Sequence, residues 1–127
     1  MGAGQVNPAE TGRRGEAAAA KYYLQQGCTL LAHNYRSRMG ELDLVVQQPD
    51  GTVVICEVKT RSPGSLASPA AAVDAAKQRR LICTAQLYLQ QTGRSDAPVR
   101  FDVAEVKPLD SGRWMVHIIR GAFLCKG

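Results

Sequence analysis

Charged residues lie inside two short apolar runs of this sequence, and this combination restricts the possible fold more than any other feature. The runs and their charged members are Gly40–Val46 with Glu41 and Asp43, and Ile55–Arg61 with Glu57 and Lys59. Their composition and apolar–polar pattern predict two β-strands. Burying a carboxylate or an ammonium costs several kcal/mol unless the group is paired or binds a metal. The two strands are therefore expected to build a site.

The turn between these strands decides how they pair. The connection reads Gln48-Pro-Asp-Gly-Thr52. A two-residue Asp-Gly turn would place the proline in the ladder, where it has no N–H to donate. A three-residue loop with Gly51 in a left-handed conformation would pair Gln48 with Thr52 instead. The sequence favours this second alternative.

The favoured register gathers the charged side chains on one face. Counting back along both strands gives two facing pairs, Asp43 with Glu57 and Glu41 with Lys59. Two carboxylates with Cβ atoms ~5 Å apart repel unless a cation lies between them. Mg²⁺ or Mn²⁺ fits, because such hard ions bind a few carboxylates, waters and phosphate oxygens. An ordinary ladder of salt bridges on a solvent-facing sheet is the alternative.

Composition narrows the class of protein. A chain of 127 residues with 45% apolar residues is long enough for a single domain, predicted over residues 1–127. The formal net charge of +5 fits a polyanionic partner, most simply nucleic acid. The four cysteines have no zinc-site spacing, and no apolar run reaches the ~20 residues of a membrane span. We expect a cytoplasmic protein that does not bind membranes.

Apolar periodicity and turn residues predict seven elements. They are a helix over 8–26 that ends at Gly27, strands over 29–35, 40–48 and 52–60, a loop over 62–69, a helix over 70–91, and strands over 99–106 and 114–119. This order predicts an α/β domain with a central mixed five-stranded sheet flanked by helices. Gly12 and Gly15 inside the first helix indicate that another backbone or a ligand comes close there, unless the helix begins near Arg14.

Six segments in this order resemble the YraN family of small bacterial proteins. They are Gly12-Arg-Arg-Gly-Glu16-Ala-Ala, Asn34-Tyr-Arg36, Gly40-Glu-Leu-Asp-Leu-Val45, Glu57-Val-Lys59-Thr-Arg61, Lys77-Gln-Arg-Arg80 and Arg100-Phe-Asp-Val103. The resemblance covers nearly the whole chain. It implies the restriction-endonuclease-like core of the PD-(D/E)xK nuclease-like superfamily, which also contains archaeal Holliday-junction resolvases.

The resemblance also implies roles for individual residues. Asp43 and Glu57 match the metal-binding carboxylates, and Lys59 matches the catalytic lysine. Glu16, expected on the first helix, matches the acid that completes the site in resolvase-like members, as a catalytic residue and metal ligand. Leu42 stands where the superfamily usually has a proline. Glu41 has two possible roles, a supporting residue that pairs with Lys59 or Arg61 and a further metal ligand, of which the first is favoured.

Basic residues flank the predicted site in sequence and are candidates for phosphate contacts. They are Arg13, Arg14, Arg36, Arg38, Arg61, Lys77 and Arg80. On the second helix, Val73, Ala76, Cys83 and Leu87 are expected to form one apolar stripe, with Arg80 inside it and Lys77 at its edge. These two cations would need the acidic site as a partner, or would extend along the helix to reach water.

Three functions compete at this stage. The first is a Mg²⁺- or Mn²⁺-dependent endonuclease that acts on DNA, including branched or structured DNA. The second is a nucleic-acid-binding module that keeps the nuclease fold without catalysis. The third, the least favoured, is an interaction protein in which the charged strands form only a salt-bridged surface. The resolvase-like relatives act as symmetric dimers, which suits two-fold symmetric DNA, so a homodimer is a further expectation.

Overall fold

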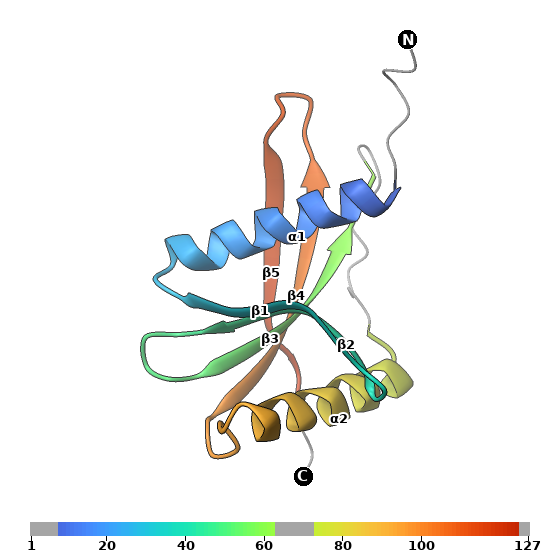
Figure 1. Ribbon diagram of the computed structural model, residues 1–127. Helices are drawn as coiled ribbons and strands as arrows, with labels where there is room; N and C mark the ends of the chain where they lie inside the picture. The colour runs from blue at the N-terminus through green and yellow to red at the C-terminus, as the bar shows by residue number, and fades with distance from the viewer. Residues whose placement is uncertain (1–7, 63–72, 125–127) are drawn as a thin grey trace.

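Two helices enclose a five-stranded sheet in the computed structural model, which describes residues 8–62 and 73–124 (Figure 1). The elements are α1 (Pro8–Gln25), β1 (Thr29–Ser37), β2 (Gly40–Gln47), β3 (Val53–Thr60), α2 (Ala75–Gln91), β4 (Val99–Pro108) and β5 (Trp114–Phe123). The predicted order of helices and strands is confirmed. The strands lie in the spatial order β1-β2-β3-β4-β5.

The sheet is mixed because one connection crosses over and the others are hairpins. β3 and β4 pair in parallel, and α2 lies between them in the chain. The other three strand pairs are antiparallel. A parallel pair needs a crossover of a dozen residues or more, usually a helix. The predicted mixed five-stranded sheet is therefore confirmed.

The β2–β3 hairpin adopts the favoured register. Leu44 pairs with Cys56, and Gln47 pairs with Val53. The N–H of Gln48 donates to the carbonyl of Thr52 at 2.8 Å, which closes a three-residue loop. Gly51 has φ +95° in this loop, as the turn requires.

The helices cover opposite faces of the sheet, as Figure 1 shows. On the α1 side, the buried residues Ala19 and Tyr23 belong to a cluster that includes Leu44, Val54 and Cys56. On the α2 side, the cluster includes Leu81, Ala85, Tyr88, Val45, Ile55 and Val103. Alternate residues of each central strand thus pack against different helices, because side chains in a strand point alternately to the two faces.

The second helix begins later than predicted and buries a different stripe. It starts at Ala75, where the Asp74 side chain accepts a hydrogen bond from the Lys77 N–H at 2.8 Å. Its buried residues are Leu81, Thr84, Ala85, Tyr88 and Leu89. The expected stripe through Cys83 was wrong, since Cys83 is exposed. Most of the predicted loop over 62–69, like residues 70–72 of the predicted helix, lies outside the described residues.

The two glycines of the first helix have different surroundings. A Cβ atom added at Gly15 would collide with the Thr60 side chain and lie 2.8 Å from Val106 Cγ2. A Cβ atom added at Gly12 would meet nothing within 4 Å. The expected close approach is therefore confirmed at Gly15, where the neighbours are side chains of the sheet, whereas no atom of the described residues makes one at Gly12. No helix among the described residues is long and apolar enough to cross a membrane.

This difference predicts opposite effects of the same substitution. Gly15→Ala should lower the free energy of unfolding by about 1–3 kcal/mol, because the methyl group overpacks the contact between α1 and the sheet. Gly12→Ala should leave it unchanged or raise it by up to about 1 kcal/mol, because alanine favours the helix. Urea unfolding of both variants measures the difference. Equal effects would contradict the close packing of α1 at Gly15.

Candidate active site

Asp43 lies where β2 and β3 separate. The last paired residues of this hairpin are Leu44 and Cys56, and beyond them the Val58 N–H donates to Asp43 Oδ2 at 2.9 Å. The carboxylate thus accepts a backbone hydrogen bond from the neighbouring strand. Leu42 belongs to the α2-side cluster and Leu44 to the α1-side cluster. The regular alternation of faces is therefore broken at Asp43.

The strand on the other side of β2 is also distorted at this point. His33 pairs with Leu44 and Tyr35 pairs with Leu42, so Asn34 lies opposite Asp43. Asn34 has φ +51°, a left-handed conformation that asparagine tolerates better than most residues. Sequence reasoning gave Asn34 no role, although it opens one of the segments that carry the family resemblance.

The carboxyl groups of Glu57 and Asp43 lie close enough to influence each other's charge. The pKa of Glu57 is raised from its ordinary value of 4.5 to about 7, first because burial penalises the charged form and next because the Asp43 charge is near. A hydrogen bond between the two side chains raises the pKa further, whereas the Lys77 charge lowers it. The two carboxyl groups thus lie close together, as predicted, although the ladder of β2 and β3 ends before them at Leu44 and Cys56.

Lys77 of α2 supplies the cation that contacts this pair. Its Nζ lies 3.3 Å from Glu57 Oε2, and the Glu57 side chain is only 12% exposed. Glu57 therefore faces α2. The sequence left two alternatives for Lys77, an ion pair with the acidic site or extension into water. The structure shows the ion pair.

Lys59 follows Glu57 on the same face of β3. The neighbouring Thr60 packs against α1 at Gly15, so Lys59 points to the α2 side as Glu57 does. Lys59 is half-buried, and it pairs in the parallel ladder with Glu105 of β4. The Lys59 side chain forms no hydrogen bond or ion pair within residues 8–62 and 73–124.

Glu105 is a buried acid beside the site that sequence reasoning missed. It is 6% exposed and accepts from Arg61, whose Nη2 lies 3.2 Å from Glu105 Oε2. It could have been found by the criterion used for Asp43 and Glu57, because it is a charged residue inside the apolar run Val103–Val106. Arg61 is therefore tied to a protein carboxylate.

Glu16 approaches the site from the opposite helix. The pKa of its carboxyl group is raised, first by burial and next by the charge of Asp43, while a hydrogen bond from Asn34 lowers it. The charge of Glu41 also raises the pKa slightly. Glu16 on α1 and Lys77 on α2 thus flank Asp43 from the two faces of the sheet.

Glu41 has a different partner from the one expected. It lies beyond the end of the β2–β3 ladder, and its Oε1 is 3.6 Å from Arg36 Nε. Both side chains are more than half exposed. The expected partner, Lys59 or Arg61, was wrong, because the strands separate at Asp43 and carry Glu41 away from β3.

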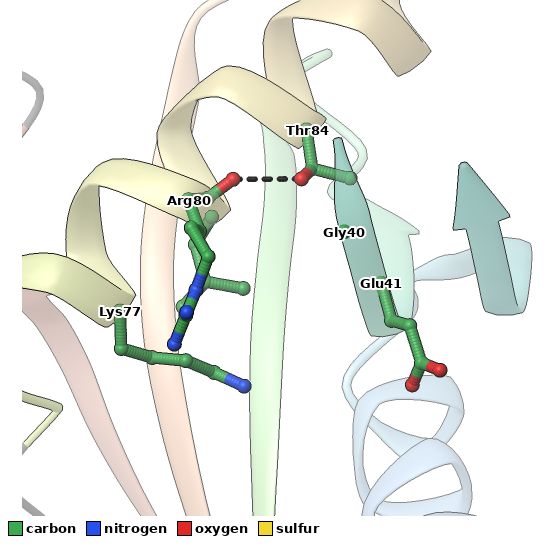
Figure 2. A pocket seen from close by; sticks show the side chains of 6 residues that line it. Gly40, Glu41, Lys77, Arg80 and Thr84 are labelled. Atoms are coloured by element: carbon green, nitrogen blue, oxygen red, sulfur yellow. Dashed lines mark hydrogen bonds between the residues drawn. The ribbon is translucent and has the colours of Figure 1, made fainter. Parts of the chain in front are cut away.

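The predicted phosphate-binding residues occupy several environments. Arg13 and Arg38 are exposed, and Arg14 forms a surface ion pair with Glu10 at 3.2 Å. Arg80 lines a pocket of about 210 Å³ with Gly40, Glu41, Lys77, Leu81 and Thr84 (Figure 2). This pocket lies between α2 and the start of β2. Lys77, which forms part of its lining, also contacts Glu57. Arg80 and Lys77 are therefore the two predicted cations that line this pocket.

The chemistry of the donors fits one hard divalent cation. Mg²⁺ is commonly held by one or two carboxylates with water and substrate phosphates, which Asp43 and Glu57 can provide. In the part of the chain that the structure describes, no three His, Cys, Asp or Glu side chains are close enough to hold a metal together. Glu16 is therefore not grouped with the other two as a third direct ligand, and its predicted contribution to metal binding stays a prediction.

Asp102 is a fully buried acid whose carboxylate is satisfied by the protein alone, and it serves as a comparison for the site. Asp102 accepts from both Arg100 Nε and Nη2, from the Tyr23 hydroxyl at 2.7 Å and from the Gly121 N–H. Four donors satisfy its two oxygens. Among the described residues, the two adjacent acids Asp43 and Glu57 have one contacting cation, Lys77, which leaves the pair able to accept more positive charge.

The raised pKa of Glu57 predicts a pH dependence of stability. Because the folded state holds the proton more tightly than the unfolded chain, stability should be greatest below pH 4.5 and fall as pH rises through about 7. We expect a loss of about 1–2 kcal/mol after allowance for solvent screening. Urea unfolding in EDTA between pH 4.5 and 8 measures it, with Glu57→Gln as the control that should lack this component. Parallel profiles for the two proteins would contradict it.

Comparisons with known proteins agree with the resemblance drawn from the sequence. The profile described as "Uncharacterised protein family UPF0102" matches residues 15–106. UPF0102 protein STH1475 of Symbiobacterium thermophilum is 46% identical over 112 residues, which cover 88% of this chain and 94% of the relative. A UPF0102 protein of Frankia casuarinae, Francci3_3586, is 43% identical over 112 residues, with the same two coverages.

Among solved structures, SfsA of Pyrococcus furiosus in complex with Ca²⁺ matches with a TM-score of 0.44 and 14% identity. The match covers 88% of this chain and 63% of that chain. The profile spans well over half of the 127 residues, and the relatives match nearly from end to end. The chain therefore belongs to the UPF0102 family, the YraN group of PD-(D/E)xK nuclease-like proteins.

Proposed function

We propose that this protein is a metal-dependent endonuclease that hydrolyses phosphodiester bonds in DNA, with branched or structured DNA as its substrate. The observation that carries the proposal is the pair of adjacent carboxyl groups, Asp43 and Glu57, at the point where β2 and β3 separate. Lys59 lies on the same face of β3, two residues from Glu57. Membership of a nuclease-like family supports the same chemistry. A cytoplasmic location and a two-fold symmetric dimer belong to the same proposal.

Each residue of the candidate site would have a separate role, set by its position. Asp43 and Glu57 would hold Mg²⁺ or Mn²⁺, and the Val58 N–H fixes the orientation of the Asp43 carboxylate. The chemistry that such an ion supplies is polarisation of a phosphoryl oxygen and activation of a water molecule. Lys59 would direct its ammonium at the charge that develops on the phosphate in the transition state. Glu16 would bind a water molecule on the α1 side of the site.

A second function is favoured by a specific observation. The Lys77 ammonium contacts Glu57, and no three metal-ligating side chains gather among residues 8–62 and 73–124. A carboxylate held by a lysine needs no metal for charge balance. The second candidate is therefore a nucleic-acid-binding module that uses the nuclease fold without catalysis. Its DNA binding would depend on salt and not on metal.

The two candidates differ in a cleavage assay. We expect the protein to cut labelled DNA in Mg²⁺ or Mn²⁺, with single-stranded, duplex, flap and four-way-junction substrates compared side by side. EDTA should stop the reaction. Lys59→Met should lower the rate by about 10²-fold or more, because it removes a charge that stabilises the transition state. Asp43→Asn should have a similar effect, and it retains an oxygen that can accept from Val58.

Thermal unfolding of both variants serves as the folding control. Cleavage that survives in well-folded Asp43→Asn protein would contradict the proposed mechanism. Absence of cleavage on every substrate, together with salt-sensitive binding in gel shift that EDTA does not change, would select the binding module instead.

A further inference from the structure

We propose that Lys77 is a built-in counter-ion of the Asp43–Glu57 pair, which a divalent cation displaces and which then binds a phosphate group of the nucleic acid in the adjoining pocket. This exchange rests on the proposed function, because it requires the carboxyl pair to accept a divalent cation. Lys77 then has two alternative partners, one in the metal-free protein and one in the loaded complex.

The first partner is Glu57. The Lys77 Nζ lies 3.3 Å from Glu57 Oε2 and joins α2 to β3 across the α2 side of the sheet. The Glu57 side chain is 12% exposed, whereas that of Lys77 is 40% exposed. The acid is therefore fixed within the sheet, and the lysine reaches it from a position that is open to solvent. Of the two, Lys77 is the group that can leave.

A divalent cation and the ammonium would compete for the same place. Glu57 and Asp43 are adjacent carboxyl groups, and Asp43 Oδ2 already accepts from the Val58 N–H. An ion held by both acids must approach Glu57, where it would meet the positive charge of Lys77. Like charges at such short range repel strongly in a partly buried site. Binding of the ion therefore favours release of the lysine.

The second partner would occupy the pocket that Lys77 already lines. This pocket of about 210 Å³ is bordered by two cations, Lys77 and Arg80, and by one acid, Glu41. Figure 2 shows Lys77 running from α2 toward the strands, while the Glu41 carboxylate points away from the helix. Glu41 is also paired with Arg36. The pocket is thus electropositive, and its composition suits a phosphate group.

The backbone around this pocket is closely packed. Gly40, with φ +146°, comes so near to α2 that an added Cβ atom would lie 2.8 Å from Thr84 Oγ1. Thr84 is fully buried and donates to the Arg80 carbonyl at 2.7 Å. The wall of the pocket is therefore fixed. A phosphate that enters it would meet the Lys77 ammonium a short distance from the carboxyl pair.

The exchange makes the binding of metal and the binding of nucleic acid cooperative. A divalent cation frees Lys77 for a phosphate, and by thermodynamic reciprocity a bound phosphate that attracts Lys77 strengthens metal binding. In the absence of both ligands, Lys77 offsets part of the negative charge of the acidic pair and lowers its affinity for free divalent ions. Metal would then be held firmly only in the presence of substrate.

Mn²⁺ binding without nucleic acid tests the first half of the exchange. We expect Lys77→Met to bind Mn²⁺ about fivefold or more tightly than the wild type by electron paramagnetic resonance, at fixed pH and ionic strength. Lys77→Arg should resemble the wild type because it keeps the charge. Arg79→Met is the matched control, since Arg79 is exposed on the same helix and does not line the pocket. Lys77→Gln removes the same charge if Lys77→Met does not fold.

Binding of a fluorescein-labelled four-way DNA junction tests the second half. Fluorescence anisotropy would be measured in EDTA and in Ca²⁺, a hard divalent ion with the same preference for oxygen ligands. Ca²⁺ should tighten binding by wild-type and Arg79→Met protein. Lys77→Met should lose most of this gain, because it has no ammonium to transfer to the phosphate. An undiminished gain in Lys77→Met would overturn the assignment of the pocket.

The outcomes separate this exchange from the proposed function. If Lys77→Met binds Mn²⁺ no more tightly than Arg79→Met, the counter-ion role is overturned even where the wild type cuts DNA. If Lys77→Met binds Mn²⁺ more tightly but the wild type cuts no substrate, the counter-ion role stands and the nuclease proposal fails. If neither protein binds Mn²⁺, both are overturned.

Discussion

The hydrogen bond from the Val58 N–H to the Asp43 carboxylate is the interaction on which the candidate site depends. In a regular hairpin this N–H would donate to a backbone carbonyl or face away from the neighbouring strand. Here a side chain accepts it, the ladder ends at Leu44 and Cys56, and β2 departs from β3. This hydrogen bond to a side chain also holds the Asp43 carboxyl group beside that of Glu57. One irregular hydrogen bond thus marks both the end of the β2–β3 ladder and the position of the candidate site.

The balance of charge distinguishes this site from the rest of the protein. Asp102 is satisfied by four donors, and Glu105 is paired with Arg61. Asp43 and Glu57 share one backbone donor and one lysine between two acids. Removing charge from water without full compensation costs stability. The chain tolerates that cost at one place, which is a physical reason to look there for a ligand.

The sequence predicts local geometry well and helix orientation poorly. The Pro49–Gly51 loop was enough to predict the hairpin register, because loop length fixes the pairing of the strands and alternation fixes the faces. On α2, the buried stripe lies one residue from the expected one, a rotation of about 100°. The expected stripe ran through the apolar Cys83, whereas the structure buries the polar Thr84 instead. Thr84 is buried all the same, since its hydroxyl bonds within the helix. The partner of Glu41 was also missed, since the separation of the strands at Asp43 arises from a tertiary hydrogen bond that no spacing encodes.

Close packing at two glycines places the helix-borne residues of the site. Gly15 lets α1 approach Thr60, and Gly40 lets β2 approach Thr84 of α2. Each glycine is followed directly in the chain by an acid that faces the charged region, Glu16 after the first and Glu41 after the second. A larger side chain at either position would move a helix relative to the sheet. The positions of Glu16, Asp43 and Lys77 relative to one another therefore depend on the close contact of these glycines with the Thr60 and Thr84 side chains. The packing of both helices thus controls the electrostatics of the site.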